Sequence, residues 1–327
     1  MKNKDLVLIV ATISLFLLIV TSLSLGSVNV PTKILFRVLT GEDVPTYGDI
    51  ILKLRLPRII ESIFVGMALS IAGAFFQGLL RNPMAEPYIL GVSSGSALGA
   101  TIAIVTNLGI FGVNVLSFLI GIITTFFVYL VSQSSGRVST YLLILVGVAT
   151  NSMLFSIISL LAFLNHEEFA QVFLWIMGSF TLVGWRDVIV SVPIITIGSF
   201  VMYLFSRDVN AILTGEESAE HLGIDVEKTK RILLIMGSIL TASCVSVSGI
   251  IGFVGLIVPH ISRIIVGPDN RILIPVSAIL GANFMLLADL IARLIIKPAE
   301  MPVGIITAFF GTPFFLYLLL KTRRSEL

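Results

Sequence analysis

Charged side chains are scarce in this 327-residue sequence, where Asp, Glu, Lys and Arg together make up 12%. An ordinary soluble domain has about 25%. Hydrophobic residues make up 56%, and a water-soluble protein of this length could not bury so much apolar surface. The scarcity of charge therefore excludes an ordinary soluble fold and predicts an all-α integral membrane protein. The net charge of +2 gives no indication of a nucleic-acid partner.

Cysteine and histidine are equally rare. The one cysteine, Cys244, lies in an apolar run, which excludes an internal disulfide framework. The three histidines, His166, His221 and His260, are far apart, and no His-Glu-x-x-His pair occurs. We therefore expect no metal site and no cofactor.

Motifs for chemistry are also scarce. The sequence has one Gly-x-Ser-x-Gly match, GVSSG at residues 91–95, but it lies within a long uncharged run and not at the strand-to-helix turn that would present a nucleophilic serine. The sequence has no Gly-x4-Gly-Lys-Ser/Thr loop, in which backbone N–H groups cradle phosphates. A membrane-embedded enzyme is therefore a poorly supported alternative, and we expect any ATP hydrolysis to reside in another chain.

Long uncharged runs, by contrast, are abundant. A helix needs about 20 apolar residues to cross a hydrocarbon core about 30 Å thick, so these runs predict eight to ten spans. They occupy residues 6–25, 62–80, 87–136 (two spans), 138–166, 188–206, 232–262 (one span and a short segment), 272–288 and 303–320. The segment 169–185 is apolar but short and contains two glycines, so its crossing stays open.

The two ends of the chain and its basic residues indicate an orientation. Residues 6–25 exceed the length of a signal-peptide core and no clear Ala-x-Ala site follows them, so we expect a retained span; a cleaved signal is the alternative. With ten spans and both termini in the cytoplasm, 13 of the 21 Lys and Arg residues lie inside and 8 outside. This modest bias agrees with the positive-inside rule.

Charges within the spans are few. Asp289 precedes Arg293 by four residues, and Glu61 follows Arg58 by three, so each acid can pair with its local arginine on one helix face. An ion-coupled carrier usually has a lone carboxylate or an unwound polar segment at mid-membrane. The basic neighbours of Asp289 and Glu61 argue against such a carrier, which stays as the alternative function.

Small residues recur four apart within the predicted spans and predict closely packed helices. The rows are Gly66, Ser70 and Ala74; Gly95, Gly99 and Ala103; and Gly304, Ala308 and Thr312.

The longest polar segment between the later spans is residues 207–231. Thr214 and Glu217 have the spacing of a capping box, Gly223 interrupts, and Asp225 can cap a second helix. We predict two short helices here, which form either a functional loop or a simple solvated connector.

Four blocks of sequence resemble the iron-chelate and cobalamin permease family, the FecCD type. One block begins LRLPRIIESIFVG at residue 54 and continues to residue 100; another is GEESAEHLGI, residues 215–224. The others are residues 136–151 and the stretch from residue 248 through the last span. The likeness covers the whole chain except the first span.

The resemblance implies an architecture and a set of partners. It implies an inner-membrane protein with one permease domain, residues 1–327. This domain would have ten transmembrane helices and both termini in the cytoplasm. A second permease subunit, which we expect to be identical, would complete a central pathway. Two cytoplasmic ATP-binding-cassette ATPases and an extracytoplasmic substrate-binding protein would complete the importer, which explains the missing phosphate loop.

The resemblance also implies roles for particular residues. Arg55, Arg58 and Arg293 match arginines that accept acidic residues of the binding protein, and guanidinium suits this because it grips carboxylates bidentately. The alternative is that Glu61 and Asp289 satisfy Arg58 and Arg293 and that all three meet lipid headgroups. The residues that match the ATPase-coupling loop are Gly215, Glu216, Glu217, Ala219, Leu222 and Gly223.

The cytoplasmic gate implied by the family involves Asn82, Pro83 and Met84, with Ser139 and Thr140 before the fifth span. Met84 stands where relatives often have leucine. Gly147, Asn151 and Ser152 are candidates for lining the pathway; Asn151 could equally be an interhelical hydrogen-bonding residue.

The implied cargo is a metal chelate, with a ferric siderophore as first choice. Cobalamin, haem and oxyanions such as molybdate remain alternatives.

Overall fold

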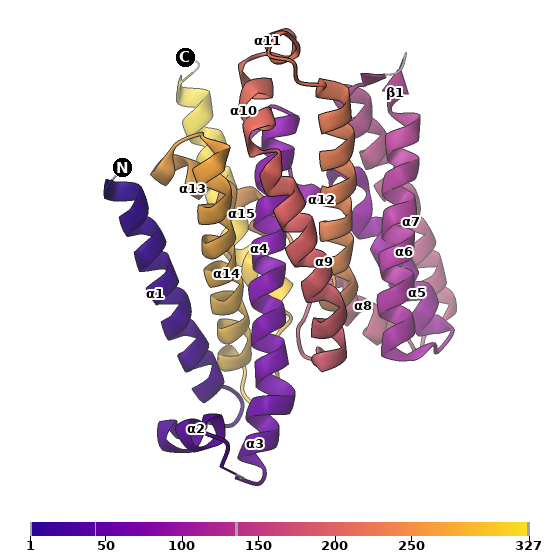
Figure 1. The fold of residues 1–327 in the computed structure, drawn as a ribbon. Coiled ribbons are helices and arrows are strands. Elements are labelled where there is room, and N and C mark those ends of the chain that lie inside the picture. Colours follow the sequence, from indigo (N-terminus) through magenta and orange to yellow (C-terminus); the bar gives the residue numbers. More distant parts are fainter. Residues whose placement is uncertain (1, 43, 135–136, 326–327) are drawn as a thin grey trace.

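A computed structural model describes residues 2–42, 44–134 and 137–325 of the chain, which form a bundle of helices (Figure 1). The first half contains α1 (Lys2–Ser24), α2 (Thr32–Leu39), α3 (Tyr47–Asp49), the π-helical turn η1 (Ile50–Arg55), α4 (Leu56–Leu79), the 3₁₀ turn η2 (Pro87–Leu90), α5 (Val92–Val105), α6 (Gly109–Val131), the short hairpin β1 (Gln133–Ser134) and β2 (Arg137–Val138), and α7 (Thr140–Leu164). The second half contains α8 (Phe169–Ile176), α9 (Trp185–Leu204), α10 (Ser206–Thr214), α11 (Glu216–His221), α12 (Val226–Ser248), α13 (Val254–Val266), α14 (Asn270–Ile295) and α15 (Val303–Ser325).

Seven helical segments within the described residues are long and apolar enough to cross a membrane. They are Lys4–Ser24, Tyr47–Leu79, Gly109–Val131, Thr140–Leu164, Trp185–Leu204, Val226–Ser248 and Asn270–Ile295. Three shorter apolar helices accompany them: Val92–Val105, Val254–Val266 and Val303–Tyr317. The uncertain segment 169–185 contains only the eight-residue α8, which at 1.5 Å per residue is about 12 Å long and cannot span the bilayer.

Both chain ends lie at one end of the bundle, together with α10 and α11, while α2 and α3 lie at the other (Figure 1). Helix α4 is the centre of the fold, since nearly every residue from Val65 to Leu79 is buried and it packs against α14, α13, α12 and α9. Outer helices such as α1 and α6 expose rows of large apolar side chains, which is the reverse of a soluble protein and suits lipid.

Two of the three predicted rows of small residues pack helix against helix, whereas Thr312 of the third row is exposed. A Cβ on Gly66 of α4 would lie 2.3 Å from the carbonyl oxygen of Gly281 on α14. A Cβ on Gly99 of α5 would lie 2.3 Å from the carbonyl oxygen of Leu116 on α6. These contacts bring helix backbones together, which is how helices associate in lipid.

Two segments outside the α-helices, residues 81–91 with the 3₁₀ turn η2 and residues 249–253, pack against each other inside the bundle. The Tyr88 hydroxyl donates to the Ile251 carbonyl at 2.8 Å and accepts from the Ile251 N–H at 3.2 Å. Oε1 of Glu86 accepts from the N–H of Phe253 at 2.7 Å. These bonds satisfy backbone groups that could not be left open in a membrane interior.

The polar segment 207–231 differs in detail from its prediction. Thr214 is the last residue of α10 and caps nothing, so the predicted capping box with Glu217 is wrong. Instead α11 starts after Gly215, whose φ of +144° suits glycine. The predicted cap at Asp225 is confirmed, because its Oδ1 accepts from the Lys228 N–H at 2.9 Å at the start of α12.

Candidate functional site

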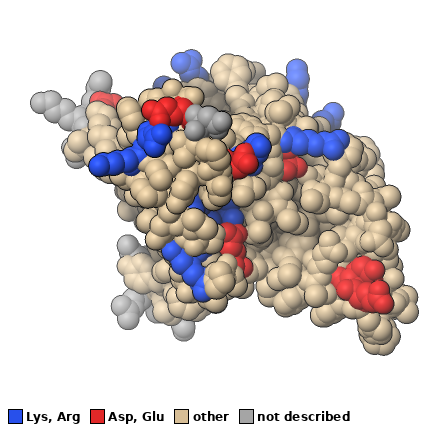
Figure 2. Space-filling model, turned by 90° about the horizontal axis from the view of Figure 1, so that it is seen from below, with Lys and Arg blue, Asp and Glu red and all other residues tan. Residues whose placement is uncertain are grey.

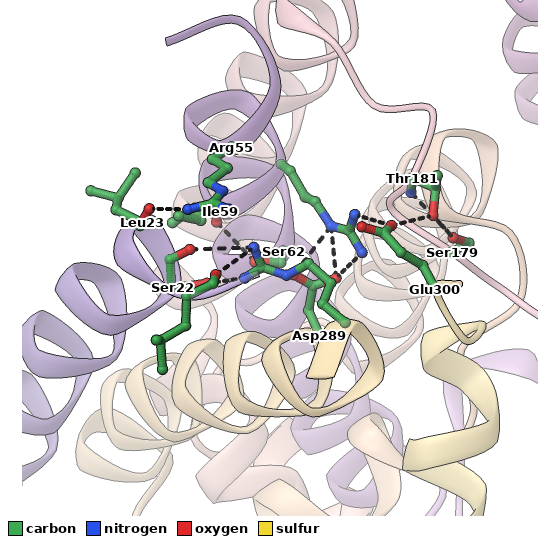
Figure 3. A network of polar contacts seen from close by, with 12 residues as sticks. Ser22, Leu23, Arg55, Ile59, Ser62, Ser179, Thr181, Asp289 and Glu300 are labelled. Carbon is green, nitrogen blue, oxygen red and sulfur yellow. Dashed lines mark hydrogen bonds and ion pairs between the residues drawn. The ribbon is translucent and has the colours of Figure 1, made fainter. Parts of the chain in front are cut away.

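Three buried arginines gather at the end of the bundle where α2 and α3 lie. Figure 3 shows the polar network at this point, with Arg55 close to Leu23 and with Asp289 and Glu300 in the same network. We call Arg55, Arg58 and Arg293 the arginine cluster. Arg55 ends the π-helical turn η1, and Pro57 is the second residue of α4, which continues directly from that turn. Arg293 lies in the last turn of α14. The α4–α14 packing therefore brings residues more than 230 positions apart into one network.

Arg58 is held by two acids. Its Nε and Nη2 lie 2.9 and 2.8 Å from Oδ1 of Asp289, and its Nη1 lies 2.6 Å from Oε2 of Glu300. The Arg58 side chain is 9% exposed and that of Asp289 is 0% exposed. Glu300 is the more accessible acid, at 22%. A buried guanidinium with two carboxylates is well satisfied, since each bond is charge-assisted.

Arg293 shares Asp289 with Arg58. Its Nε lies 3.2 Å from Oδ2 of Asp289, and its Nη1 donates to the Ser22 carbonyl at 3.3 Å. Its Nη2 also donates to the Ser22 hydroxyl. Asp289 thus lies between two guanidiniums, and α1, α4 and α14 meet at this point.

Arg55 is held by main-chain oxygens. Its Nη1 donates to the carbonyls of Leu23 and Ser24, the latter at 3.1 Å, and its Nη2 donates to the carbonyl of Val28. These carbonyls belong to the end of α1 and the turn that follows it. Arg55 therefore fixes the path of the chain after the first helix.

The structure tests the local pairs predicted from the sequence. The Asp289–Arg293 pair is confirmed. The Arg58–Glu61 pair is wrong, because Arg58 turns to Asp289 and Glu300. Glu61 is fully buried, and its Oε2 accepts from the Ser191 hydroxyl of α9 at 2.7 Å. Its Oε1 has no hydrogen-bond partner among the described residues, so the basic neighbour expected beside Glu61 is absent there.

Glu300 and Ser22 were not singled out by the sequence. Glu300 lies in the short loop between α14 and α15 and also accepts from the Thr181 hydroxyl at 3.1 Å. Partial burial raises the pKa of Glu300, but the Arg58 guanidinium outweighs it and holds that pKa below its usual value. The sequence feature that could have indicated Glu300 is its position, since it is an acid only seven residues after Arg293.

Charge on this end of the molecule is mixed. Figure 2 shows basic and acidic atoms adjoining one another near the middle of the face. A cavity of about 600 Å³ lies beside the cluster, with Glu300, Thr181, Trp175, Asn114 and Asp187 among its lining residues. Nδ2 of Asn114 donates to Oδ1 of Asp187 at 2.6 Å. Among the described residues, no group of three or more His, Cys, Asp or Glu side chains could hold a metal ion.

The predicted coupling residues lie together at the opposite end, but they do not all face outward. Leu222 is 72% exposed and Glu217 is exposed. Ala219 is fully buried against Ile212 and Val226, which leaves it no surface for a partner. Glu216 pairs with Lys230, with its Oε2 2.8 Å from Nζ, while its own side chain is 44% exposed. The glycines Gly215 and Gly223 have positive φ and mark the ends of the α11 turn.

The predicted gate residues make local hydrogen bonds. Oδ1 of Asn82 accepts from the Met84 N–H at 2.9 Å, and Pro83 between them is exposed. Ser139 caps α7, where its hydroxyl accepts from the Leu142 N–H at 3.4 Å, and Thr140 begins that helix.

Only one of the three predicted lining residues faces outward. Gly147 is buried, and a Cβ there would lie 2.0 Å from the Ile89 carbonyl oxygen, so it packs against η2. Oδ1 of Asn151 accepts from the Ser94 hydroxyl at 2.5 Å, which bears out its interhelical alternative. Ser152 is exposed and bonds back to the Val148 carbonyl. It continues along α7 as an exposed row with Ser156 and Ser159.

Comparison with known proteins gives consistent matches over nearly the whole chain. A sequence model of the FecCD transport family matches residues 14–321. The uncharacterized ABC transporter permease YvrB of Bacillus subtilis is 43% identical, over 94% of this chain and 91% of its own length. The cobalamin import permease BtuC of Halobacterium salinarum is 45% identical, over 84% of this chain and 75% of its own length. A solved structure described as an inward-facing conformation of a metal-chelate type ABC transporter superposes with a TM-score of 0.87 at 32% identity, covering 97% of this chain and 99% of that one.

Proposed function

Because this chain belongs to the FecCD transport family, we propose that it is the membrane permease subunit of an ATP-driven importer for a metal chelate. The observation that carries the proposal is the match of the whole fold to a metal-chelate ABC transporter at 32% identity. The chain is a multi-pass membrane protein. ATP hydrolysis would come from a separate pair of ATPase subunits, since the sequence has no phosphate-binding loop.

We propose ten spans with both termini in the cytoplasm. The seven long apolar helices and the three shorter ones together supply that number. The shorter helices α5 and α13 follow segments 81–91 and 249–253, which lie outside the α-helices and whose backbone is hydrogen-bonded inside the bundle. Such broken spans are tolerated in membranes only where protein buries the irregular backbone.

The ATPase would dock on the exposed part of α11 and the turn after it. Leu222 and Glu217 supply an apolar contact and a charge at the end of the bundle that holds both termini. Glu216 and Ala219 would fix α11 to α12 and α10, Glu216 through Lys230 and Ala219 through its burial. The cytoplasmic gate would lie at Asn82, Pro83 and Met84 and at Ser139 and Thr140, whose local bonds can reopen without breaking ion pairs.

The binding protein would dock on the opposite end, at the arginine cluster. Arg58 is the member best placed, because its partner Glu300 is partly exposed while Asp289 is fully buried. An acidic side chain of the binding protein would take the place of Glu300 on Nη1 of Arg58. Arg55 and Arg293 would support the site from within, since their guanidiniums are occupied by α1 and by Asp289.

A second permease subunit, identical to this one, would cover the polar row on α7. Ser152, Ser156 and Ser159 are exposed on a helix that otherwise presents apolar residues. Lipid is a poor neighbour for such a row, whereas a second copy across a central pathway is a good one. For the cargo itself we propose a ferric siderophore, with cobalamin and haem as the next candidates, in line with the cobalamin permease among the relatives.

The proposal is tested by co-expression with the ATPase and binding protein encoded nearest to this chain. We expect the three to co-purify, and vesicles loaded with ATP to accumulate labelled chelate only when the binding protein is outside. Uptake that persists without ATP and collapses when ion gradients are removed would instead establish an ion-coupled carrier.

A further inference from the structure

An apolar groove runs between α6 and α12 in the half of the bundle nearest the termini. Its volume is about 560 Å³, and Leu90 and Leu143 also line it. Each wall follows one face of a helix, because the lining positions recur at three- and four-residue spacings. They are Ile122, Thr125, Phe126 and Tyr129 on α6, and Arg231, Leu234, Ile235, Ser238 and Ile239 on α12.

One end of the groove is polar and carries a cation. Arg231 is exposed, and its Nε donates to the Tyr129 hydroxyl at 3.0 Å, with Gln133 nearby on β1. The Tyr129 hydroxyl therefore orients the Arg231 guanidinium, and it accepts from only one of the five N–H donors of Arg231. None of the lining residues is acidic. The groove is thus an apolar trough with a positively charged mouth.

The length of the groove matches one leaflet of a bilayer. From Arg231 to Ile239 α12 rises through eight residues, about 12 Å. Half of a hydrocarbon core is about 15 Å. Arg231 lies in the second turn of α12, close to where that helix leaves α11 at the end of the bundle. The apolar part therefore lies at the depth of acyl chains and the guanidinium at the depth of headgroups.

We propose that the groove binds one acyl chain of an anionic phospholipid and that Arg231 binds its phosphate. Guanidinium is suited to phosphate because its planar fork offers paired donors. Lys228 is exposed three residues earlier on α12 and adds a second positive charge on the same side. A polar chelate is a poor occupant, because beyond Arg231 and Tyr129 the walls offer it few hydrogen-bonding groups.

The groove also touches the segments next to the proposed cytoplasmic gate. Leu143 lies in the first turn of α7, three residues after Thr140, and Leu90 ends η2. A bound acyl chain would touch both segments, which lead into the two loops proposed as the cytoplasmic gate. The lipid would therefore fill space that changes if α7 moves against α6 and α12.

The test uses the full-length protein in nanodiscs of equal parts phosphatidylcholine and phosphatidylglycerol. A phosphatidylglycerol probe with a photoactivatable group at the end of one acyl chain is added, and crosslinked peptides are mapped by mass spectrometry. We expect crosslinks on residues 122–133 and 231–239. Labelling there should fall by about fivefold or more in Arg231→Glu, and in Ile235→Trp, which fills the groove without changing its charge.

Arg207→Glu is the matched control, since Arg207 is exposed at the same end of the bundle but outside the groove. Size-exclusion profiles and melting curves show whether each variant is folded. Equal labelling of Arg231→Glu and Arg207→Glu would overturn the proposal. So would equal labelling by a phosphatidylcholine probe, which would indicate an apolar surface without headgroup recognition, and so would crosslinks from the groove to a second protein copy.

Discussion

Glu300, in the loop that joins α14 to α15, lies with its Oε2 2.6 Å from Nη1 of Arg58 on α4. The chain thereby places an acid of its own on the guanidinium that we propose as the docking point for an acidic partner. Glu300 also accepts from Thr181, so it joins the loop before α9 to the arginine cluster. Docking of a binding protein would have to displace an existing partner rather than meet a free cation.

Removing this competitor should strengthen docking. In Glu300→Gln, Arg58 keeps Asp289 but loses its exposed carboxylate, so we expect the affinity for the binding protein to rise by about three- to tenfold. The measurement is titration of nanodisc-embedded protein with labelled binding protein. Glu167→Gln, at an exposed acid after α7, is the control and should leave the affinity unchanged. Weaker binding by Glu300→Gln would show that Glu300 supports docking instead.

The Glu300–Arg58 pair should also respond to acid. Because the pKa of Glu300 is held below its unfolded value, the pair stabilises the folded state fully above the unfolded pKa of about 4.3. This contribution is lost as pH falls through the lower, folded pKa. The melting temperature of the natural chain should therefore fall more between pH 6 and pH 3.5 than that of Glu300→Gln. Parallel curves for the two proteins would contradict this assignment.

The buried Asp289 should contribute far more to the stability of the folded chain than an acid in an exposed ion pair. Asp289→Asn leaves two buried guanidiniums without their shared carboxylate, which we expect to cost about 3–5 kcal/mol. Thermal unfolding in detergent measures the loss. The control is Asp49→Asn, since Asp49 pairs with Lys53 in the open, where an ion pair contributes less than about 1 kcal/mol. Similar melting temperatures for both variants would remove Asp289 from the centre of the network.

Leu222 should couple the permease to its ATPase. Leu222→Ser removes the most exposed apolar contact of the segment 215–224, so we expect co-purified ATPase to fall by about tenfold while the permease stays folded. Leu213→Ser, on neighbouring α10, is the matched control. Deletion of residues 218–223 should abolish uptake altogether. Normal uptake in the deletion variant would exclude this segment as the coupling site.

Glu61 offers a direct test against ion coupling. Glu61→Gln keeps the shape and the bond with Ser191 while removing a carboxyl group that has one unpartnered buried oxygen. We expect unchanged ATP-driven uptake and a melting temperature that is equal or higher, because a buried carboxylate without a cation is costly. An ion-coupled carrier that used Glu61 would lose transport in this variant. Glu61→Leu, which also loses the Ser191 bond, should be less stable than Glu61→Gln.

Much of the fold follows from the length and polarity of local runs. Helices α1, α4, α7 and α9 follow their uncharged runs, and Asp225 caps α12 as its side chain predicts. The local pair of Asp289 with Arg293 also followed, but the partners of Arg58 and Glu61 did not, because they depend on which helices meet. Arg58 has Glu61 three residues away, yet α4 turns Arg58 toward α14 and Glu61 toward α9. The sequence pattern shows which residues share a helix, and tertiary packing decides which of them share a site.

The same limit applies to the coupling segment. The resemblance placed Ala219 and Leu222 together as contact residues, but one helical turn separates a buried face from an exposed one. In a six-residue helix, a shift of one position decides whether a side chain meets a partner. Exposure of this kind depends on how α11 rests on α10 and α12, which periodicity over six residues cannot specify.

The bond from the Phe253 N–H to Glu86 closes the start of α13, which matters for the proposed passage of a solute beside this helix. The start of a helix carries a partial positive charge, and transporters with broken helices often direct such ends at an anionic substrate or ion. Here a carboxylate of the same chain already occupies the start of α13. The broken helix α13 therefore presents a capped end, and a charged chelate moving past it would meet a terminus whose first N–H already has a partner.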